Sequence, residues 1–320
     1  MESDNILLKK RMTEGAGKKR KLISEIWKHR YLYLLLLPGL VYFVLFKYFP
    51  IAWLGISFQD FKLLKGISGS EFVGLKNFKD FFTSPDCWMI IKNTLILNCY
   101  SILFEFPTTV LFALFINEVR AAKFKKTVQT ISYLPHFIST VVLVGLINSM
   151  VSSLPPGPVY KLIAAFTGTE SSILGNESYF RSIYTVSSIW QQTGWSAIVY
   201  IAALSDIDPT YYEAATVDGA GRLRQLIHIT IPCIMNTVIM MLIIKVGNIM
   251  TVGFEKAYLM QSDTTRQVSE IISTYVYKRG MGDNDYSYAT AVSLFNSTIG
   301  FILVVVCNKL SRRVSEYSMW

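Results

Sequence analysis

The sequence predicts an all-α membrane protein with six transmembrane helices. Apolar residues make up 52% of the 320 residues and charged residues 17%, and the mean hydropathy is +0.37, which is unusually apolar for a soluble domain. The apolar residues also gather in segments that approach or exceed the ~20 residues needed to cross ~30 Å of hydrocarbon. We expect membrane-spanning helices at residues 31–58, 89–117, 128–151, 182–203, 233–253 and 289–309.

The N-terminal segment predicts the side of the membrane on which the chain begins. Residues 1–30 carry nine basic and four acidic residues, and such a basic tail stays in the cytoplasm. No small-residue cleavage site follows the next apolar stretch. Residues 31–58 are therefore expected to remain as an N-terminal helix, bent at Pro38 and Pro50.

The distribution of basic residues predicts the topology of the remaining loops. The tail, the segment after the second span, the 204–232 loop and the end of the chain from Lys309 together carry 18 basic residues, against 11 on the opposite side over longer loops. We therefore expect both termini and the 204–232 loop to be cytoplasmic. The loops at 152–181 and 254–288 are expected outside, the latter with a short helix at 268–277. The net charge of +9 then reflects membrane topology rather than nucleic-acid binding.

Several kinds of catalytic and metal site are not supported by the sequence. The four cysteines show no CxxC spacing, and the three histidines have no metal-ligand or triad partner at a recognisable distance. Gly15–Lys19 is not a nucleotide-binding loop, because Met12 stands where a glycine is required and Lys19 where Ser or Thr is required. We expect no catalytic residue, metal site or cofactor on this chain.

The loop at 204–232 is a short polar interruption between two apolar spans, and its residues predict a helix-turn-helix knob. Asp208 suits an N-cap and Pro209 the first helical position. Gly219 should end this first helix by adopting a positive φ. A second short helix is expected from Arg222, closing near Pro232.

The first helix of this knob has the features of a docking surface. Ala214 and Ala215 leave little side-chain bulk, so another protein could approach closely, while Glu213 offers a carboxylate to an arginine. An ordinary amphipathic loop between two spans is the alternative interpretation.

The same residues resemble a known family. Glu213–Ala215, followed by Gly219 and by Ile229–Pro232, is similar to the "EAA" loop of the membrane subunits of binding-protein-dependent ABC importers, although Ile231 stands where that family usually has Leu. The resemblance covers about Tyr31 to Trp320. The wider block Trp190–Ala220 looks like the carbohydrate branch of this family. Three further blocks look like the polysaccharide and oligosaccharide permeases within that branch, namely Lys245–Asn248, Gly253–Glu255 and Thr274–Tyr277.

The resemblance implies a fold, a function and a set of partners. The fold is a type I, MetI-like permease core of five helices at 89–309, preceded by one extra helix. The function is ATP-driven import of an oligosaccharide by alternating access across the bacterial inner membrane, with no chemistry on this chain. The partners are a second homologous permease, a cytoplasmic ATPase homodimer that holds ATP and Mg, an extracytoplasmic solute-binding protein and membrane lipid. The residues implied in ATPase coupling are Glu213, Ala214, Ala215, Asp218 and Gly219.

Residues Phe72–Phe78 resemble the first external loop of the same family. Residues 59–88 have two possible interpretations: they contact a partner outside the membrane, or they form an amphipathic segment that lies at the membrane interface. Lysines in the external loops are compatible with an anionic substrate, but lysines also solvate loops.

Two charged residues are expected inside the membrane, where each costs about 2.5–3.5 kcal/mol at the bilayer centre. Glu105 in the second span and Lys245 in the fifth lie at a similar depth, roughly 18 Å from the cytoplasmic ends of their helices, so they could meet. One hypothesis is that Lys245, with Asn248 one turn away, lines the translocation path. The alternative is a Glu105–Lys245 tie between two helices.

The fourth span is polar for a lipid-facing helix. Gln191, Gln192 and Trp195 should face protein or a water-filled path, and the alternative is interhelical hydrogen bonding with no ligand. Trp190 and Trp195 could stack on sugars or simply pack. A rival function is an ion-coupled secondary sugar carrier, which needs membrane carboxylates, and only Glu105 is clearly available.

Overall fold

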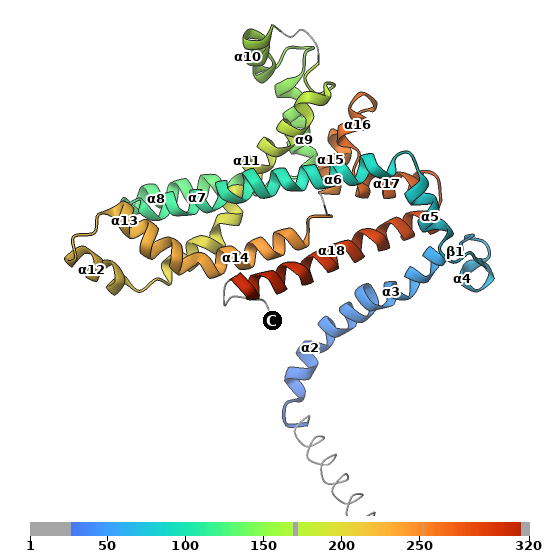
Figure 1. The fold of residues 1–320 in the computed structure, drawn as a ribbon, viewed down its shortest axis with the longest axis horizontal. Coiled ribbons are helices and arrows are strands. Elements are labelled where there is room, and N and C mark those ends of the chain that lie inside the picture. Colours follow the sequence, from blue (N-terminus) through green and yellow to red (C-terminus); the bar gives the residue numbers. More distant parts are fainter. Residues whose placement is uncertain (1–26, 169–171, 252, 315–320) are drawn as a thin grey trace, which may run out of the picture. The chain divides into compact units, whose positions relative to one another are not determined.

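The computed structural model describes residues 27–168, 172–251 and 253–314, and these residues are almost entirely helical (Figure 1). They divide into two compact units, Met1–Ile56 and Ser57–Trp320. The first unit contains α2 (Arg30–Phe43), η1 (Val44–Tyr48), α3 (Phe49–Trp53) and the start of η2 (Leu54–Phe58). The second unit contains β1 (Gln59–Asp60), α4 (Gly66–Gly69), β2 (Glu71–Phe72), α5 (Lys76–Thr83), α6 (Cys87–Tyr100), η3 (Ser101–Glu105), α7 (Phe106–Glu118), α8 (Ala122–Tyr133), η4 (Leu134–Phe137), α9 (Thr140–Val151), α10 (Pro158–Thr167), α11 (Glu177–Ser205), α12 (Pro209–Val217), α13 (Arg222–Gln225), η5 (Leu226–Thr230), α14 (Ile231–Gly247), α15 (Phe254–Met260), η6 (Asp263–Thr265), α16 (Arg266–Ser269), α17 (Ile272–Tyr277), η7 (Lys278–Gly282) and α18 (Tyr286–Val314).

Four helices in the described part of the chain are long and apolar enough to cross a membrane. They are Arg30–Phe58, Cys87–Glu118, Arg222–Gly247 and Tyr286–Lys309. The bent pair Ala122–Phe137 and Thr140–Val151 supplies a fifth if it counts as one span. α11 has 29 residues, which at ~1.5 Å per residue is enough to cross, but its polar residues keep it out of this set.

The predicted single span at 128–151 is instead broken in the structure by a bend of 98°. Pro135 lies in the tight turn η4, and the backbone of Ile138 is extended, so the helix cannot continue. Ser139 then caps α9 by accepting a hydrogen bond from the Val142 N–H. The sequence reasoning missed this break because both halves are apolar.

Three of the helices contain a wide π turn that ends two residues before a proline. η1 precedes Pro50, η3 precedes Pro107 and η5 precedes Pro232. Proline has no N–H, and its ring clashes with the carbonyl four residues back; a widened turn moves that carbonyl away and lets the helix continue. The prediction that the second helix of the knob closes near Pro232 is therefore wrong, because the helix runs without interruption from Arg222 to Gly247.

The second unit is organised around α11, which packs against α7, α8 and α14, while α14 packs against α18 (Figure 1). The closest packing uses small residues: Ala113 of α7 and Ala197 of α11 are both fully buried in one cluster with Ile234 of α14. A second cluster joins α5, α6, α17 and α18, and a third joins α9, α11 and α15.

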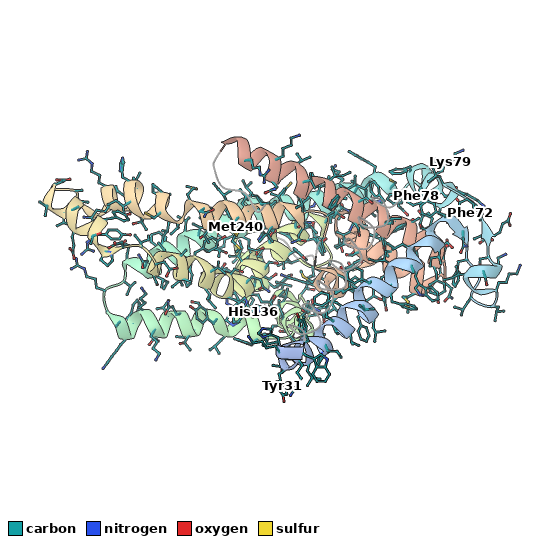
Figure 2. The ribbon with its side chains drawn as sticks, turned by 90° about the horizontal axis from the view of Figure 1, so that it is seen from below. Tyr31, Phe72, Phe78, Lys79, His136 and Met240 are labelled. Atoms are coloured by element: carbon teal, nitrogen blue, oxygen red, sulfur yellow. The ribbon has the colours of Figure 1, made fainter. Side chains whose placement is uncertain are left out.

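Short elements cover the end of the second unit where α6 and α18 begin. β1 and β2 form an antiparallel pair in which Gln59 faces Phe72, and the amphipathic helix α5 follows. Phe72, Phe78 and Lys79 lie together at this end, whereas Met240 lies midway along α14 (Figure 2). The stretch predicted as the loop 152–181 contains the helix α10, and the helix predicted at 268–277 is split into α16 and α17 around Glu270.

Candidate functional site

Glu105 and Lys245 form an ion pair between two helices of the second unit. The Lys245 Nζ donates to the Glu105 Oε1 at 2.9 Å, and the Ser101 hydroxyl donates to the Glu105 Oε2 at 2.6 Å. Glu105 closes the π turn η3 and Lys245 lies in the last turn of α14. The side chains retain 14% and 25% of their exposure, so the pair is only partly sealed from its surroundings.

Two cavities lie against this pair. The larger, of about 370 Å³, and the smaller, of about 290 Å³, share three lining residues, Glu105, Met241 and Lys245. The larger cavity is rich in hydroxyl and amide groups, which can exchange hydrogen bonds with the hydroxyls of a saccharide. These groups belong to Asn98, Ser101, Thr185, Ser188, Asn248 and Thr251.

Asn248 lies one turn beyond Lys245, as the sequence predicted, and lines the larger cavity. It ends α14, and its side-chain amide donates to the Ile244 carbonyl at 3.0 Å.

The polar residues of α11 divide into two groups. Gln191 is buried and donates to the Ile138 carbonyl at 3.1 Å, and the Gln192 Oε1 lies 3.0 Å from the His136 Nδ1. Both amides thus contact the break between α8 and α9, and neither lines the two cavities. Trp195 stacks on the His136 ring with centroids 4.5 Å apart and also lines the smaller cavity.

Lys256 is a buried lysine that the sequence reasoning placed among the external loop lysines. Its Nζ donates to the Tyr184 carbonyl at 3.0 Å and to the Ser188 hydroxyl at 2.7 Å, and lies 4.7 Å from the centroid of the Tyr184 ring. Lys256 therefore anchors α15 to α11 beside the larger cavity. The positions of the lysines in the sequence do not indicate that Lys256 is buried.

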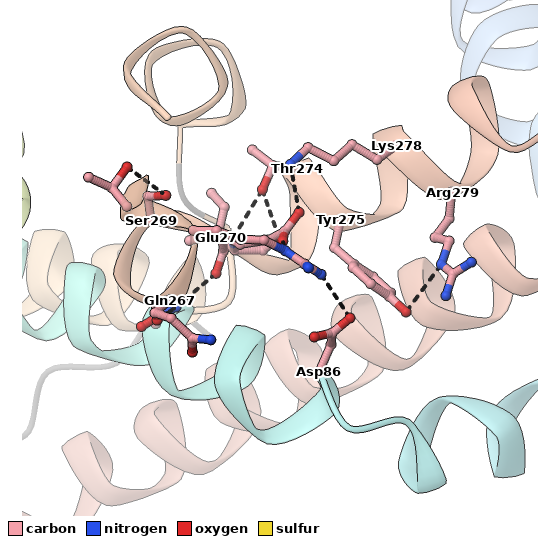
Figure 3. A network of polar contacts seen from close by, with 12 residues as sticks. Asp86, Gln267, Ser269, Glu270, Thr274, Tyr275, Lys278 and Arg279 are labelled. Carbon is pink, nitrogen blue, oxygen red and sulfur yellow. Dashed lines mark hydrogen bonds and ion pairs between the residues drawn. The ribbon is translucent and has the colours of Figure 1, made fainter. Parts of the chain in front are cut away.

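A second polar cluster was also missed, and it holds the segment after α15 against the start of α6 (Figure 3). Glu270, only 1% exposed, accepts hydrogen bonds from the Arg266 Nε and, at 2.9 Å, from the Lys278 Nζ. Arg266 also pairs with Asp86 at 2.9 Å. Burial alone would raise the pKa of the Glu270 carboxyl, but the hydrogen bonds from Arg266 and Lys278 and their charges outweigh it, so the pKa lies below its usual value.

Asn93 connects this cluster to α11. Its Nδ2 donates to the carbonyls of Gln267 and Glu270 at 2.8 and 3.1 Å, and its Oδ1 accepts from Arg181 at 2.9 Å. Three segments far apart in the sequence are thereby held together by one buried amide.

The knob has the first helix and turn that the sequence predicted. Asp208 caps α12 by accepting from the Thr210 N–H at 2.9 Å, and Gly219 adopts a φ of +78°. α12 has no buried residue: Glu213, Ala214, Asp218 and Gly219 are exposed and Ala215 is half-buried.

Internal hydrogen bonds brace this knob against the root of α14. The hydroxyls of Tyr212 and Thr230 lie 2.9 Å apart, which ties α12 to η5. Gln225 donates to the Thr216 hydroxyl and to the Ala220 carbonyl, both at 3.0 Å. α12 therefore presents an exposed surface on a support that is itself hydrogen-bonded.

Apolar helices around polar cavities, with an embedded ion pair and an exposed helical knob, define a membrane transport subunit. Residues 93–316 match the model of one family, the binding-protein-dependent transport system inner membrane component, and the chain belongs to that family.

Relatives and solved structures agree with this assignment. The chain is 44% identical to the "Polygalacturonan/rhamnogalacturonan transport system permease protein YteP" of Bacillus subtilis, over 95% of this chain and 94% of the relative. It is 41% identical to "Protein LplB" of the same organism, over 95% and 96%. A crystal structure of a bacterial alginate ABC transporter, in complex with an alginate pentasaccharide-bound periplasmic protein, contains a chain that is similar with a TM-score of 0.84 and 37% identity, over 92% of this chain and 99% of that one.

The predicted family and the predicted all-α, MetI-like permease fold are both confirmed. The protein is a carbohydrate ABC transporter permease of the binding-protein-dependent kind, an inner-membrane transport component rather than a catalytic enzyme.

Proposed function

We propose that this chain forms half of the translocation path of an ATP-driven importer of acidic oligosaccharides. A second homologous permease would supply the other half, an extracytoplasmic solute-binding protein would deliver the saccharide, and a cytoplasmic ATPase homodimer would hold ATP and Mg. In this arrangement both termini of the chain lie in the cytoplasm.

The substrate class is supported by relatives and by the site. A second similar solved structure, with a TM-score of 0.83 and 38% identity, belongs to a transporter involved in the import of the acidic polysaccharide alginate. In this chain, Lys245 places an ammonium group on the wall of a cavity lined by hydroxyls and amides. The Glu105 carboxylate on the same wall already pairs with this ammonium group, and a carboxylate of the saccharide could take its place while the hydroxyls and amides bind the sugar.

The observation that carries the coupling proposal is one continuous helix. The helix Arg222–Gly247 begins in the knob and ends beside the cavities, and it carries Lys245 in its last turn. Because the Tyr212–Thr230 contact ties α12 to this helix, a displacement of α12 by a docked ATPase would move Lys245. Glu213, Ala214, Ala215, Asp218 and Gly219 would form the docking surface, with Glu213 paired to an arginine of the ATPase.

The other residues predicted in the translocation path would line or support it. Trp195 and Glu105 line the smaller cavity together with Lys245. Gln191 and Gln192 would support the path from behind by holding the break at Ile138.

Reversing the charge of Glu213 tests the coupling. In the complete transporter with its binding protein, Glu213→Arg should lower ATP-dependent uptake by about tenfold or more and weaken co-purification of the ATPase, since a charge-assisted contact contributes ~1.5–3 kcal/mol. Asp80→Arg, a charge reversal at an exposed position on α5, is the control and should leave co-purification of the ATPase unchanged. Equal uptake by the Glu213→Arg variant and the unaltered protein would rule out this docking surface.

A further inference from the structure

The two cavities beside the ion pair follow one another along two of the helical segments that line them. Along α6, η3 and α7, the residues before Glu105 line the larger cavity and those after it the smaller one. α11 shows the same division. On the antiparallel helix α14 and the residues after it, Met241 and Lys245 line both cavities, and Ile244, Asn248 and Thr251 line the larger one alone. Asn98 and Ser101 line the larger cavity and Phe106 and Thr109 the smaller one, and on α11 Ser188 lines the larger cavity and Trp195 the smaller one.

The ion pair therefore lies at the boundary between two cavities that are stacked along the helix bundle. Only Glu105, Met241 and Lys245 line both. A route from one cavity to the other along these helices runs beside the 2.9 Å contact between the Lys245 Nζ and the Glu105 carboxylate.

Opening this contact has unequal consequences for its two partners. Glu105 keeps the hydrogen bond from the Ser101 hydroxyl, at 2.6 Å, which stabilises the carboxylate after the lysine has left. Among the residues that the structure describes, Glu105 is the acceptor that Lys245 contacts, so separation leaves the ammonium group without its counter-charge. A carboxylate on the solute would replace that counter-charge, whereas a neutral saccharide offers only hydroxyls.

We propose that the Glu105–Lys245 pair is a gate between the two cavities, and that it opens by exchange of partners when a carboxylate of the passing saccharide takes the place of Glu105 on Lys245. This inference rests on the proposed function, because it takes the two cavities to be parts of the saccharide path. It adds a mechanism of selection: acidic saccharides open the gate at little cost, and neutral ones must leave Lys245 without an anion.

Reagent access to the smaller cavity tests the gate without any saccharide. Ser196→Cys places a thiol on the wall of the smaller cavity, in a chain whose four native cysteines are replaced by serine. In spheroplasts that contain the whole transporter, a membrane-impermeant thiol reagent is added outside, on the side of the larger cavity. Combining Glu105→Gln with Lys245→Gln should speed labelling about tenfold, the factor that corresponds to a loss of ~1.4 kcal/mol from the closed state.

The matched control is Lys245→Arg, which keeps the charge pair and should label as slowly as the chain with both native residues. Glu105→Gln alone is the second variant if the double variant fails to assemble, and it should also label fast because Lys245 has lost its partner. Equal labelling of all these variants, whether fast or slow, would overturn the gate.

Partner exchange is tested with an oligogalacturonate trimer and the same trimer after reduction of its carboxyl groups, each added with the binding protein. The acidic trimer should speed labelling of the chain with the intact pair, and the reduced trimer should not. Equal labelling with both would overturn partner exchange. Uptake of the acidic trimer is measured separately. If the transporter does not import this trimer but the variants label as expected, the proposed substrate class is refuted and the gate is not.

Discussion

The Lys245 ammonium group contributes to stability through its ion pair with Glu105, and this predicts a non-additive pair of substitutions. Lys245→Met should leave the Glu105 carboxylate with the Ser101 hydroxyl alone and lower the free energy of unfolding by about 1–3 kcal/mol, less than for a fully sealed pair because both side chains retain some exposure. Adding Glu105→Gln should recover part of this loss. The unfolding midpoints of the purified transporter would measure both effects.

The matched control for this cycle is Lys92→Met, which removes an exposed lysine from the same membrane helix as Glu105. Lys92→Met should change the free energy of unfolding by no more than about 0.5 kcal/mol. Strictly additive losses for Lys245→Met and Glu105→Gln would show that the two charges do not stabilise one another.

The buried Glu270 carboxylate predicts a loss of stability on the acid side. Its pKa is depressed in the folded state, so its contribution is complete above the ordinary glutamate pKa of ~4.3 and is lost as the pH falls from there through the lower folded pKa. The Glu270→Gln variant should be less stable than the unaltered protein at neutral pH. It should also lose less stability as the pH falls, because it has no carboxylate at this position to protonate. Unfolding midpoints of the two proteins between neutral pH and about pH 3 would test this, and parallel curves would contradict it.

Single-residue predictions from the sequence succeeded where helix geometry alone decides the outcome. Glu105 and Lys245 could be matched in depth because the rise per residue is fixed, and the structure pairs them at 2.9 Å. Lys256 and Glu270 were missed because their burial depends on segments distant in sequence, α11 for one and the start of α6 for the other.

At the scale of helices, glycines mark where two elements approach closely. A Cβ added to Gly194 of α11 would lie 2.0 Å from the Ser132 carbonyl oxygen of α8, whereas one added to Gly145 of α9 would meet nothing within 4 Å. Gly194→Ala should therefore push α8 from α11 and cost about 1–3 kcal/mol. Gly145→Ala, the matched change at a helix position that no other residue approaches, should be neutral or up to ~1 kcal/mol stabilising.

Thermal unfolding of the two purified variants measures this difference. Since Gly194 also precedes Trp195, fluorescence of the stacked indole gives a second readout of a shifted α11. Equal midpoints for the two alanine variants would mean that the approach of α8 to α11 is loose.

The same scale shows why the boundaries of elements were harder to predict than their existence. Proline indicated a helix end near Pro232, but the π turn η5 accommodates the ring and the helix continues to Gly247. The 98° break near Ser139 escaped notice for the opposite reason, since apolar residues continue on both sides of it. Tertiary packing decides both cases.

For the whole molecule, hydropathy predicted the class, and the polar helix α11 shows where hydropathy alone is insufficient. α11 packs against α7, α8 and α14, its glutamines contact protein and its Thr185 lines the larger cavity, so it need not be apolar. The sequence predicted this helix as the fourth span, at 182–203, and its polar residues indicated that it faces protein or a water-filled path.

The final prediction concerns the energy source of the whole transporter, because the knob has a function only if force arrives from another protein. The complete complex in proteoliposomes should take up oligosaccharide with ATP in the lumen, where the docked ATPase lies, and should continue to do so when ionophores abolish all ion gradients. A complex whose ATPase carries an inactivating substitution should lose uptake, although it still assembles on α12. An ion-coupled sugar carrier predicts the reverse, with uptake by this permease and its homologous partner without the ATPase and collapse of that uptake on addition of ionophore. Only the first outcome gives a reason for an exposed helix, braced by the Tyr212–Thr230 contact, at the root of the helix that ends beside Lys245.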